Sequence, residues 1–353
     1  MAKLVLLDTN RTGRHAEELE NKLRALVVGQ EEAIHEIVSA YQSHVSGLAP
    51  AGRPIANLLF LGPTGSGKTR VVEALGQALL GDPRAVIKID CGEFQHSHEI
   101  AKLIGSPPGY LGHRETRALL SQETLNEHHT DKMKVSLVLF DEIEKATDAL
   151  WNLLLGILDK GVLTLGDNRR VDFSSAMIFM TSNLGAAEMC AVSRLGFHDA
   201  AVEEPGRHEA RLSRIGAAAA RRRFTPEFIN RLDRMVVFKP LGGEELRRVL
   251  DIELEAVQKR LENATGPEFQ FSLAGDAREL LLSEGTDSRY GARHLKRAIE
   301  RLLVHPLSSL MCSGQIRHGD YIQIRHEPGA SSLSFFREAA VRDAARAAGP
   351  LAA

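Results

Sequence analysis

The sequence predicts a doubly wound parallel α/β sheet followed by a smaller, mostly helical domain. One observation is a series of short β-rich runs that are apolar on both faces and alternate with helical segments, as strands buried inside a parallel sheet do. A second observation is that this alternation stops near Pro240, after which helical periodicity dominates. The predicted strands span residues 57–61, 85–90, 136–140, 176–181 and 235–238.

Changes in pattern along the chain divide it into four parts. Beyond Pro240, Leu250, Leu254 and Val257 form an apolar stripe at helical spacing, and a strand-like run at 321–325 closes a small domain. The last residues are rich in Ala, Arg, Gly and Ser, which is typical of a loose tail. The predicted parts are a flexible N-terminus (1–15), a large α/β domain (16–239), a small C-terminal domain (240–328) and a loose tail (329–353).

The composition limits the class of protein. The chain has 353 residues, of which 43% are hydrophobic and 25% charged, and its net charge of −2 lacks the basic excess of a general nucleic-acid surface. The three cysteines form no CxxC pair, which argues against a disulfide framework or a zinc site and fits a reducing cytosol. No segment approaches the roughly 20 apolar residues that cross a bilayer. We therefore expect a cytoplasmic protein with neither a membrane nor a nucleic-acid partner.

A glycine-rich loop, GPTGSGKT, fits the phosphate-binding pattern G-x-x-x-x-G-K-[ST]. It follows the strand predicted at 57–61 and opens a helix, so its backbone N–H groups can form a cradle for phosphates. That context argues against a chance glycine turn. Lys68 is expected to reach the β- and γ-phosphates of ATP, and Thr69 is expected to ligate Mg²⁺. The predicted nucleotide-binding residues of this P-loop are Gly62, Pro63, Thr64, Gly65, Ser66, Gly67, Lys68, Thr69 and Arg70.

Two further strand ends carry candidate catalytic side chains. The run SLVLFDE places Asp141 and Glu142 at the end of a buried strand, where Asp141 can hold Mg²⁺ through water and Glu142 can act as the general base. The alternative is that both acids merely begin the next helix, where carboxylates suit the helix dipole. MTSNLG ends another strand with Asn183, whose amide can position the attacking water. The alternative for Asn183 is an ordinary turn residue.

An aromatic side chain stands on a loop that proline and glycine keep out of helix and strand. In SPPGYLGH, Tyr110 and Leu111 lie between Gly109 and Gly112. Burying such a ring is worth a few kcal/mol, roughly, and the alternative to a functional role is a surface tyrosine that packs on its own loop.

These motifs, together with LFDEIEKA, FTPEFINRLD and YGARHLKRAIE in this order, resemble the Clp chaperone class of AAA+ ATPases. The resemblance is to the second ATPase ring of ClpB and ClpC and covers about residues 23–325. It implies a P-loop NTPase fold with a large AAA+ domain and a small lid domain. It also implies a homohexamer that binds ATP and Mg²⁺ between its subunits.

The resemblance assigns three further nucleotide contacts. Arg231 matches the arginine finger that is offered to the ATP of a neighbouring subunit, and its alternative is a surface ion pair with Asp233 or Asp251. Arg293 matches the second sensor arginine, and its alternative is a pair with a nearby acid.

The segment Val28-Gly29-Gln30 resembles the part of the family that contacts adenine. Its alternative is a simple break between two helices.

The family also suggests contacts with polypeptides. Tyr110 and Leu111 match the pore loop that grips a threaded chain, and a second pore loop is expected near 166–170. The sequence departs from the family at 113–117 (HRETR), where members commonly have an acidic residue and paired glycines. Leu195, Gly196 and Phe197 resemble the tripeptide by which some Clp proteins dock on a ClpP-like peptidase. We expect this tripeptide to lie on a polar loop. The alternative is that Leu195 and Phe197 pack back on the domain.

The leading interpretation is an ATP-dependent unfoldase or disaggregase that threads unfolded or aggregated polypeptides through a central pore. Because no substrate-receiving domain, first ring or middle domain is evident, a recruiting adaptor or a ClpP-like peptidase is a possible partner. A second interpretation is a nucleotide-switched assembly or scaffold protein that does not thread. A nucleic-acid motor is disfavoured by the near-neutral charge and the aromatic pore loop.

Overall fold

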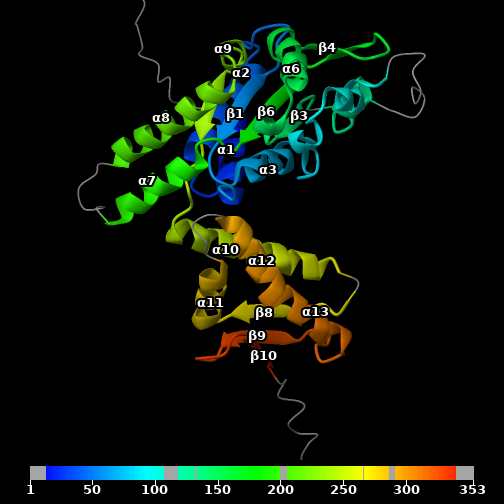
Figure 1. The fold of residues 1–353 in the computed structure, drawn as a ribbon. Helices are drawn as coiled ribbons and strands as arrows, with labels where there is room; N and C mark the ends of the chain where they lie inside the picture. Colours follow the sequence, from blue (N-terminus) through cyan, green and yellow to red (C-terminus); the bar gives the residue numbers. More distant parts are fainter. Residues whose placement is uncertain are drawn as a thin grey trace, which may run out of the picture. The chain divides into compact units, whose positions relative to one another are not determined.

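The computed structural model describes residues 13–106, 118–131, 133–198, 205–264, 266–285 and 291–338. The chain divides into two compact units, Met1–Pro240 and Leu241–Ala353, and each is described by itself (Figure 1). In the described part of the chain, no helix is both long enough and apolar enough to cross a membrane.

The first unit is built on a five-stranded parallel sheet in the order β2-β3-β6-β1-β7. The interior strand β1 is buried at all six positions, because it has a neighbouring strand on each edge and helices on each face. This arrangement confirms the predicted doubly wound sheet. The strands are β1 (Ala56–Leu61), β2 (Ile87–Asp90), β3 (Ser136–Asp141), β6 (Ala176–Ser182) and β7 (Arg234–Val237).

Helices cover both faces of this sheet, as Figure 1 shows. Leu59 and Leu61 of β1 point into one apolar core, which also contains Trp151. Leu58 and Phe60 point into a second core on the other face, because successive side chains of a strand alternate. The first core includes residues of α6 (Asp148–Lys160), α7 (Ala186–His198), α8 (Pro205–Arg223) and α9 (Pro226–Ile229), and the second those of α1 (Arg14–Leu26), α2 (Glu31–Val45) and α3 (Lys68–Leu80).

Short elements complete the first unit. The hairpin of β4 (Val162–Thr164) and β5 (Arg170–Asp172) is antiparallel and lies apart from the main sheet. The remaining elements are η1 (Cys91–Glu93), η2 (Ser97–Ile100), α4 (Ala101–Ile104), α5 (Gln122–Asn126) and η3 (Ile143–Lys145).

The second unit packs helices on a three-stranded sheet in the order β10-β9-β8. Its core contains Leu250, Leu254 and Val257, the stripe that the sequence indicated. Its helices are α10 (Gly243–Glu262), α11 (Gly275–Gly285), α12 (Ala292–Ile299), η4 (Glu300–Val304) and α13 (His305–Cys312), and its strands are β8 (Gln270–Leu273), β9 (Tyr321–His326) and β10 (Leu333–Arg337).

Strand β10 corrects the expected extent of the loose tail, which was placed at 329–353. Residues 333–337 pair antiparallel with β9, and Leu333 is buried in the core of the second unit. The short run LSFF alternates apolar and polar side chains only weakly, so the composition of the whole segment obscured it.

Candidate functional site

The P-loop lies between β1 and α3, at the carboxyl edge of the main sheet. Gly62 has φ 147°, and a Cβ atom at this position would lie 2.6 Å from the carbonyl oxygen of Phe238, so only glycine fits. Gly67 has φ 97° and caps the N-terminus of α3 without a side chain. In the part of the chain that the structure describes, no side chain therefore caps the N–H groups in the first turn of α3. These N–H groups point toward the loop, as a phosphate cradle requires.

Lys68 is buried, with 8% of its surface exposed, and its ammonium group folds back on the loop. Its Nζ atom donates to the carbonyl oxygens of Gly62 (2.7 Å) and Pro63 (2.9 Å) and to Oδ1 of Asn183 (3.0 Å). A buried ammonium group is costly unless such acceptors surround it. These carbonyl oxygens and the amide oxygen hold the lysine where phosphate oxygens can replace them.

Asn183, just beyond the end of β6, joins the P-loop to the end of β3. Its Oδ1 accepts from Lys68 and from Thr64 Oγ1 (3.3 Å), while its Nδ2 donates to Glu142 Oε1 at 3.2 Å. Its backbone N–H donates to Glu144 Oε1 at 3.0 Å, which fixes the turn that carries it. Three side chains that the sequence singled out separately, Lys68, Asn183 and Glu142, thus form one hydrogen-bonded chain.

The two acids after β3 have different environments. Thr181 Oγ1 donates a hydrogen bond to Asp141 Oδ1. The same hydroxyl accepts one from the backbone N–H of Glu142 at 3.0 Å. Glu142 has left-handed backbone angles (φ 56°, ψ 49°), which are uncommon for a residue with a Cβ atom and cost about 1–3 kcal/mol. The next helical element is the short 3-10 helix η3, which has Glu142 at its N-cap position without a side-chain cap hydrogen bond, and α6 begins only at Asp148. Asp141 is thus the last residue of β3, whereas Glu142 stands at the start of a short helix whose backbone it does not cap through its side chain.

The carboxyl edge of β2 and β3 is strongly acidic. Asp90 and Asp141 are register partners, and both lie near the buried thiol of Cys91. Burial, and then the charges of Asp141, Asp90, Glu144 and Glu142, raise the pKa of Cys91 far above its usual range.

The lysine of the same turn balances part of this charge. Lys145 forms an ion pair with Glu142 and a hydrogen bond that raises the pKa of Lys145.

The break between α1 and α2, the predicted adenine-contacting segment, contacts the P-loop through Gln30. Gly29 has φ 73°, and Val28 is buried. Gln30 is buried too, and its Nε2 donates to the carbonyl oxygens of Ser66 (3.1 Å) and Lys239 (3.0 Å). A glutamine directly after a Val-Gly helix break is the only sequence signal for this contact. The segment is thus more than a helix break, because Gln30 links it to the P-loop.

Arg231 lies at the opposite, amino edge of the sheet. Its carbonyl oxygen accepts from the side chain of Asn57 at 3.3 Å, next to the start of β1, whereas the P-loop follows the end of β1. A strand of six residues separates these edges by about 17–20 Å. Arg231 therefore cannot serve the P-loop of its own chain.

The ion pairs of Arg231 also differ from the predicted alternative. Its guanidinium group lies 3.1 Å from Glu227 and 3.9 Å from Asp159, and its Nε atom is buried without a partner in the described part of the chain. Asp233 instead accepts from the backbone N–H of Asn57 at 2.7 Å, and Asp251 pairs with an arginine of the second unit.

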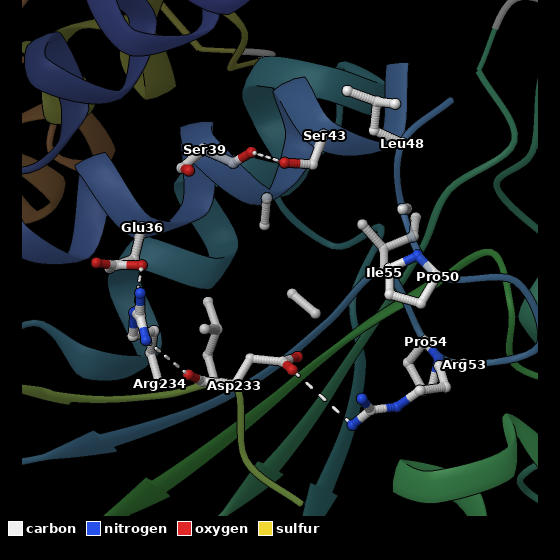
Figure 2. Close-up of a pocket in the computed structure, with 14 residues that line it drawn as sticks. Glu36, Ser39, Ser43, Leu48, Pro50, Arg53, Pro54, Ile55, Asp233 and Arg234 are labelled. Atoms are coloured by element: carbon white, nitrogen blue, oxygen red, sulfur yellow. Dashed lines mark hydrogen bonds and ion pairs between the residues drawn. The ribbon is translucent and has the colours of Figure 1, made fainter. Parts of the chain in front are cut away.

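Two ion pairs brace the turn that carries Arg231 (Figure 2). Asp233 lies 3.9 Å from Arg53, and Arg234 lies 3.3 Å from Glu36 of α2. These four side chains line a hollow of about 360 Å³ at the amino edge of the sheet, together with Ser39, Ser43, Leu48 and Pro50 among others. The turn is thus anchored to α2 and to the segment before β1.

The remaining sequence predictions have mixed outcomes. Tyr110, Leu111 and the departure at 113–117 lie outside the described residues. The expected second pore loop, 166–170, forms the tip of the β4–β5 hairpin, and the N–H of Gly166 donates to the carbonyl oxygen of Ile104 at 2.8 Å. This tip therefore contacts the end of α4, three residues before the stretch 107–117 that lies outside the described residues.

The sequence predicted a polar loop for Leu195, Gly196 and Phe197, and this prediction is wrong. They continue helix α7, because AAEMCAVSRLGFH contains no proline and one glycine does not end a helix. Arg293 belongs to the second unit, in the first turn of α12 after Gly291. Arg70 follows Lys68 in α3 and lies 3.9 Å from Glu73.

Comparison with known proteins gives matches to both units. The family described as AAA domain (Cdc48 subfamily) matches residues 53–235, and the family described as the C-terminal, D2-small domain of ClpB protein matches residues 241–324. Among curated proteins, the chaperone protein ClpB of Rhizobium meliloti (strain 1021) is 38% identical over 321 residues, or 91% of this chain and 34% of that protein. Chaperone protein ClpB 1 of Parasynechococcus marenigrum (strain WH8102) is 36% identical over 317 residues, or 90% and 34%.

A solved structure is also similar. The "Closed State CryoEM Reconstruction of Hsp104:ATPyS and FITC casein" aligns with a TM-score of 0.74 and 29% identity, over 91% of this chain and 51% of that chain. This chain spans about a third of the length of the curated relatives that it matches.

Proposed function

Because the chain belongs to the AAA domain family and carries a small domain of the ClpB type, we propose that it is an ATP-dependent protein unfoldase or disaggregase. The observation that carries the proposal is the hydrogen-bonded chain from Lys68 through Asn183 to Glu142. It joins a phosphate-binding lysine, through the Asn183 amide, to a carboxylate that can act as a general base.

The residues at the P-loop fit a nucleoside triphosphate with its metal. Lys68 exchanges the carbonyl oxygens of Gly62 and Pro63 for the β- and γ-phosphates, while the N–H groups of α3 hold further phosphate oxygens. Thr69 and Asp141 offer the hydroxyl and carboxylate oxygens that Mg²⁺ prefers. When bound, Mg²⁺ neutralises the charge that develops on the phosphates.

Glu142 and Asn183 supply the chemistry at the attacking water. The Glu142 carboxylate accepts the proton of the water molecule, and the Asn183 amide orients that molecule toward the γ-phosphate. The left-handed backbone of Glu142 aims its side chain back toward Asn183, which supports this role. Strain of this kind is often found at functional sites.

The place of Arg231 supports ATP binding between subunits of a homohexamer. Since Arg231 lies at the edge opposite to the P-loop, it reaches only the nucleotide of a neighbouring copy. Its permanent charge and planar fork suit a phosphoryl group, and fingers of this kind are worth on the order of 10³–10⁵ in rate. We assign the second sensor role to Arg293 and the adenine contact to Val28 and Gly29.

The proposed substrates are unfolded or aggregated polypeptides, which Tyr110 and Leu111 grip in the central pore. The similar solved structure holds Hsp104 with ATPyS and FITC casein, which supports this substrate class. A cytosolic location is supported by three cysteines that form no disulfide. A recruiting adaptor or a ClpP-like peptidase is a further proposal, although the helical placement of Leu195–Phe197 removes its loop argument.

The test compares ATP turnover with and without an unfolded model polypeptide, for the wild type and for Tyr110→Ala. We expect the polypeptide to stimulate hydrolysis in the wild type and Tyr110→Ala to lose only that stimulation. If turnover ignores both the polypeptide and Tyr110, threading fails and a nucleotide-switched scaffold becomes the better proposal. If the wild type does not hydrolyse ATP at all, the ATPase proposal fails as well.

A further inference from the structure

The turn after β3 folds a lysine back onto the proposed general base. Glu142 is left-handed, and the three residues that follow form η3. The backbone N–H of Lys145 donates to the carbonyl oxygen of Glu142 at 2.9 Å. This tight turn brings the two side chains together, and Lys145 Nζ forms an ion pair with Glu142 Oε2.

Buried neighbours fix the shape of this turn. Ile143 is fully buried, and its carbonyl oxygen accepts from Trp151 Nε1 at 3.1 Å. The guanidinium group of Arg223 lies 4.4 Å from the centre of a Trp151 ring and donates to the carbonyl oxygen of Glu144 at 2.8 Å. The ion pair between Lys145 and Glu142 therefore follows from a built backbone geometry, unlike most pairs between mobile surface side chains.

Both carboxylate oxygens of Glu142 consequently have protein partners. Oε1 accepts from Asn183 Nδ2 at 3.2 Å, and Oε2 pairs with Lys145. A general base must present an oxygen to the water molecule that it deprotonates. An ammonium group that already holds one of these oxygens competes with that water.

The same contacts connect this arrangement with the P-loop. Asn183 Oδ1 is held by Lys68, so the four side chains run in the order Lys68, Asn183, Glu142, Lys145. A phosphate that draws Lys68 away from Asn183 leaves the Asn183 amide free to rotate away from Glu142. Lys145 is then the one partner of this chain of contacts that still restrains the Glu142 carboxylate. The ion pair is partly exposed, with 49% of the Lys145 side chain and 33% of the Glu142 side chain accessible, and such pairs break readily.

We propose that Lys145 is a positioning residue that holds Glu142 away from the attacking water, so that this ion pair must break in the ATP-bound enzyme before hydrolysis. This inference rests on the proposed hydrolysis of ATP and adds to it a lysine that restrains the base. Charge is required for the role, and the hydrogen bond to Glu142, followed by the nearby carboxylates of Asp90 and Glu144, raises the pKa of Lys145. Lys145 is therefore an ammonium ion at neutral pH.

The experiment measures ATP turnover of the full chain with Lys145→Met, which keeps the length of the side chain and removes its charge. We expect the unstimulated kcat to rise roughly two- to fivefold, the change that a partly exposed ion pair can supply. The KM for ATP should stay within about twofold, because no phosphate contact is lost. Stimulation by an unfolded polypeptide should shrink, because part of the restraint is already gone.

Three further variants complete the design. Lys145→Arg keeps the charge and should restore the wild-type kcat. Lys145→Gln offers a second uncharged side chain if Lys145→Met folds poorly, as judged by thermal unfolding and by binding of a fluorescent ADP. Lys259→Met, on an exposed part of α10, is the matched control and should leave kcat unchanged.

A kcat that is unchanged or lower in folded Lys145→Met and Lys145→Gln would overturn the inference and leave the ATPase proposal standing. If Lys145→Arg also raises kcat, the ion pair is not the cause and the inference fails in the same way. A wild type that binds the fluorescent ADP but never hydrolyses ATP contradicts the proposed function, and the role of Lys145 falls with it.

Discussion

The backbone N–H of Asn57 donates a 2.7 Å hydrogen bond to the carboxylate of Asp233. This bond ties the second residue of β1 to the turn that carries Arg231, and the N–H of Asp233 donates in return to the carbonyl oxygen of Asn57 at 2.9 Å. The strand that leads to the P-loop therefore also anchors the proposed finger. One β-strand thus links the P-loop with the finger of the proposed intersubunit site.

We expect Asp233→Ala to lower the kcat for ATP by about tenfold, less than the 10³-fold or greater loss expected for Arg231→Ala, because the finger stays present but loses its anchor. Binding of a fluorescent ADP should be unchanged, since Asp233 lies at the edge away from the P-loop. Asp131→Ala, on a surface turn, is the control. Equal kcat in Asp233→Ala and the wild type would show that the anchor is dispensable.

Mixing two inactive variants tests whether Arg231 acts on a neighbour. Arg231→Ala retains a complete P-loop, and Lys68→Ala retains a complete finger, so an interface with one of each can be whole. We expect mixed samples to hydrolyse ATP faster than either variant by itself. Turnover in the mixture that equals the average of the two separate samples argues that the finger and the P-loop do not meet between subunits.

Gln30→Ala should weaken nucleotide binding and destabilise the first unit together. The substitution leaves the buried carbonyl oxygen of Ser66, and the partly buried carbonyl oxygen and N–H of Lys239, without the Gln30 amide. We expect the free energy of unfolding to fall by about 1–3 kcal/mol, the cost of unsatisfied buried groups. Denaturant unfolding and titration with a fluorescent ADP measure the two effects. Exposed Gln95→Ala is the control, and similar results for both variants would remove Gln30 from the site.

The buried thiol of Cys91 should make the protein sensitive to alkali. Its pKa is raised above the ordinary value of 9.0, first by burial and then by the charge of Asp141. Above about pH 9 the folded state therefore keeps a thiol proton that the unfolded state releases. The contribution of Cys91 to the free energy of unfolding is complete below that pH and falls by up to about 1.4 kcal/mol per pH unit above it. Between pH 8 and 10.5, the free energy of unfolding measured with denaturant should decline less for Cys91→Ala than for the wild type.

Alkylation gives a second readout of the same group. Iodoacetamide should modify exposed Cys312 at pH 8 and leave Cys91 unmodified, because only the accessible thiolate reacts. Equal labelling of both cysteines in the folded protein would contradict the burial and the raised pKa.

Local sequence was sufficient where a structural element and its chemistry are contiguous. The five strands of the main sheet were predicted to within two residues at each end, because continuous apolar runs between helical segments are typical of strands buried in a parallel sheet. The P-loop and the end of β3 were recognisable because glycines at fixed spacing and a carboxylate pair after a strand are local features. Leu195–Phe197 misled for the opposite reason: three residues carry too little local information to tell a loop from the end of α7.

The sequence by itself determined the fold class and predicted the P-loop and the candidate residues Asp141, Glu142 and Asn183, and its resemblance to the Clp class added Arg231. Only the tertiary structure decided which of these residues meet: Asn183 joins Lys68, 115 residues away, and Gln30 reaches Lys239 across 209 residues. It also placed Arg231 at the edge opposite to the P-loop and turned Lys145 onto Glu142. The physical reason is that periodicity records which face of an element is buried, whereas hydrogen bonds between strand ends depend on strand order and register, which no local pattern encodes.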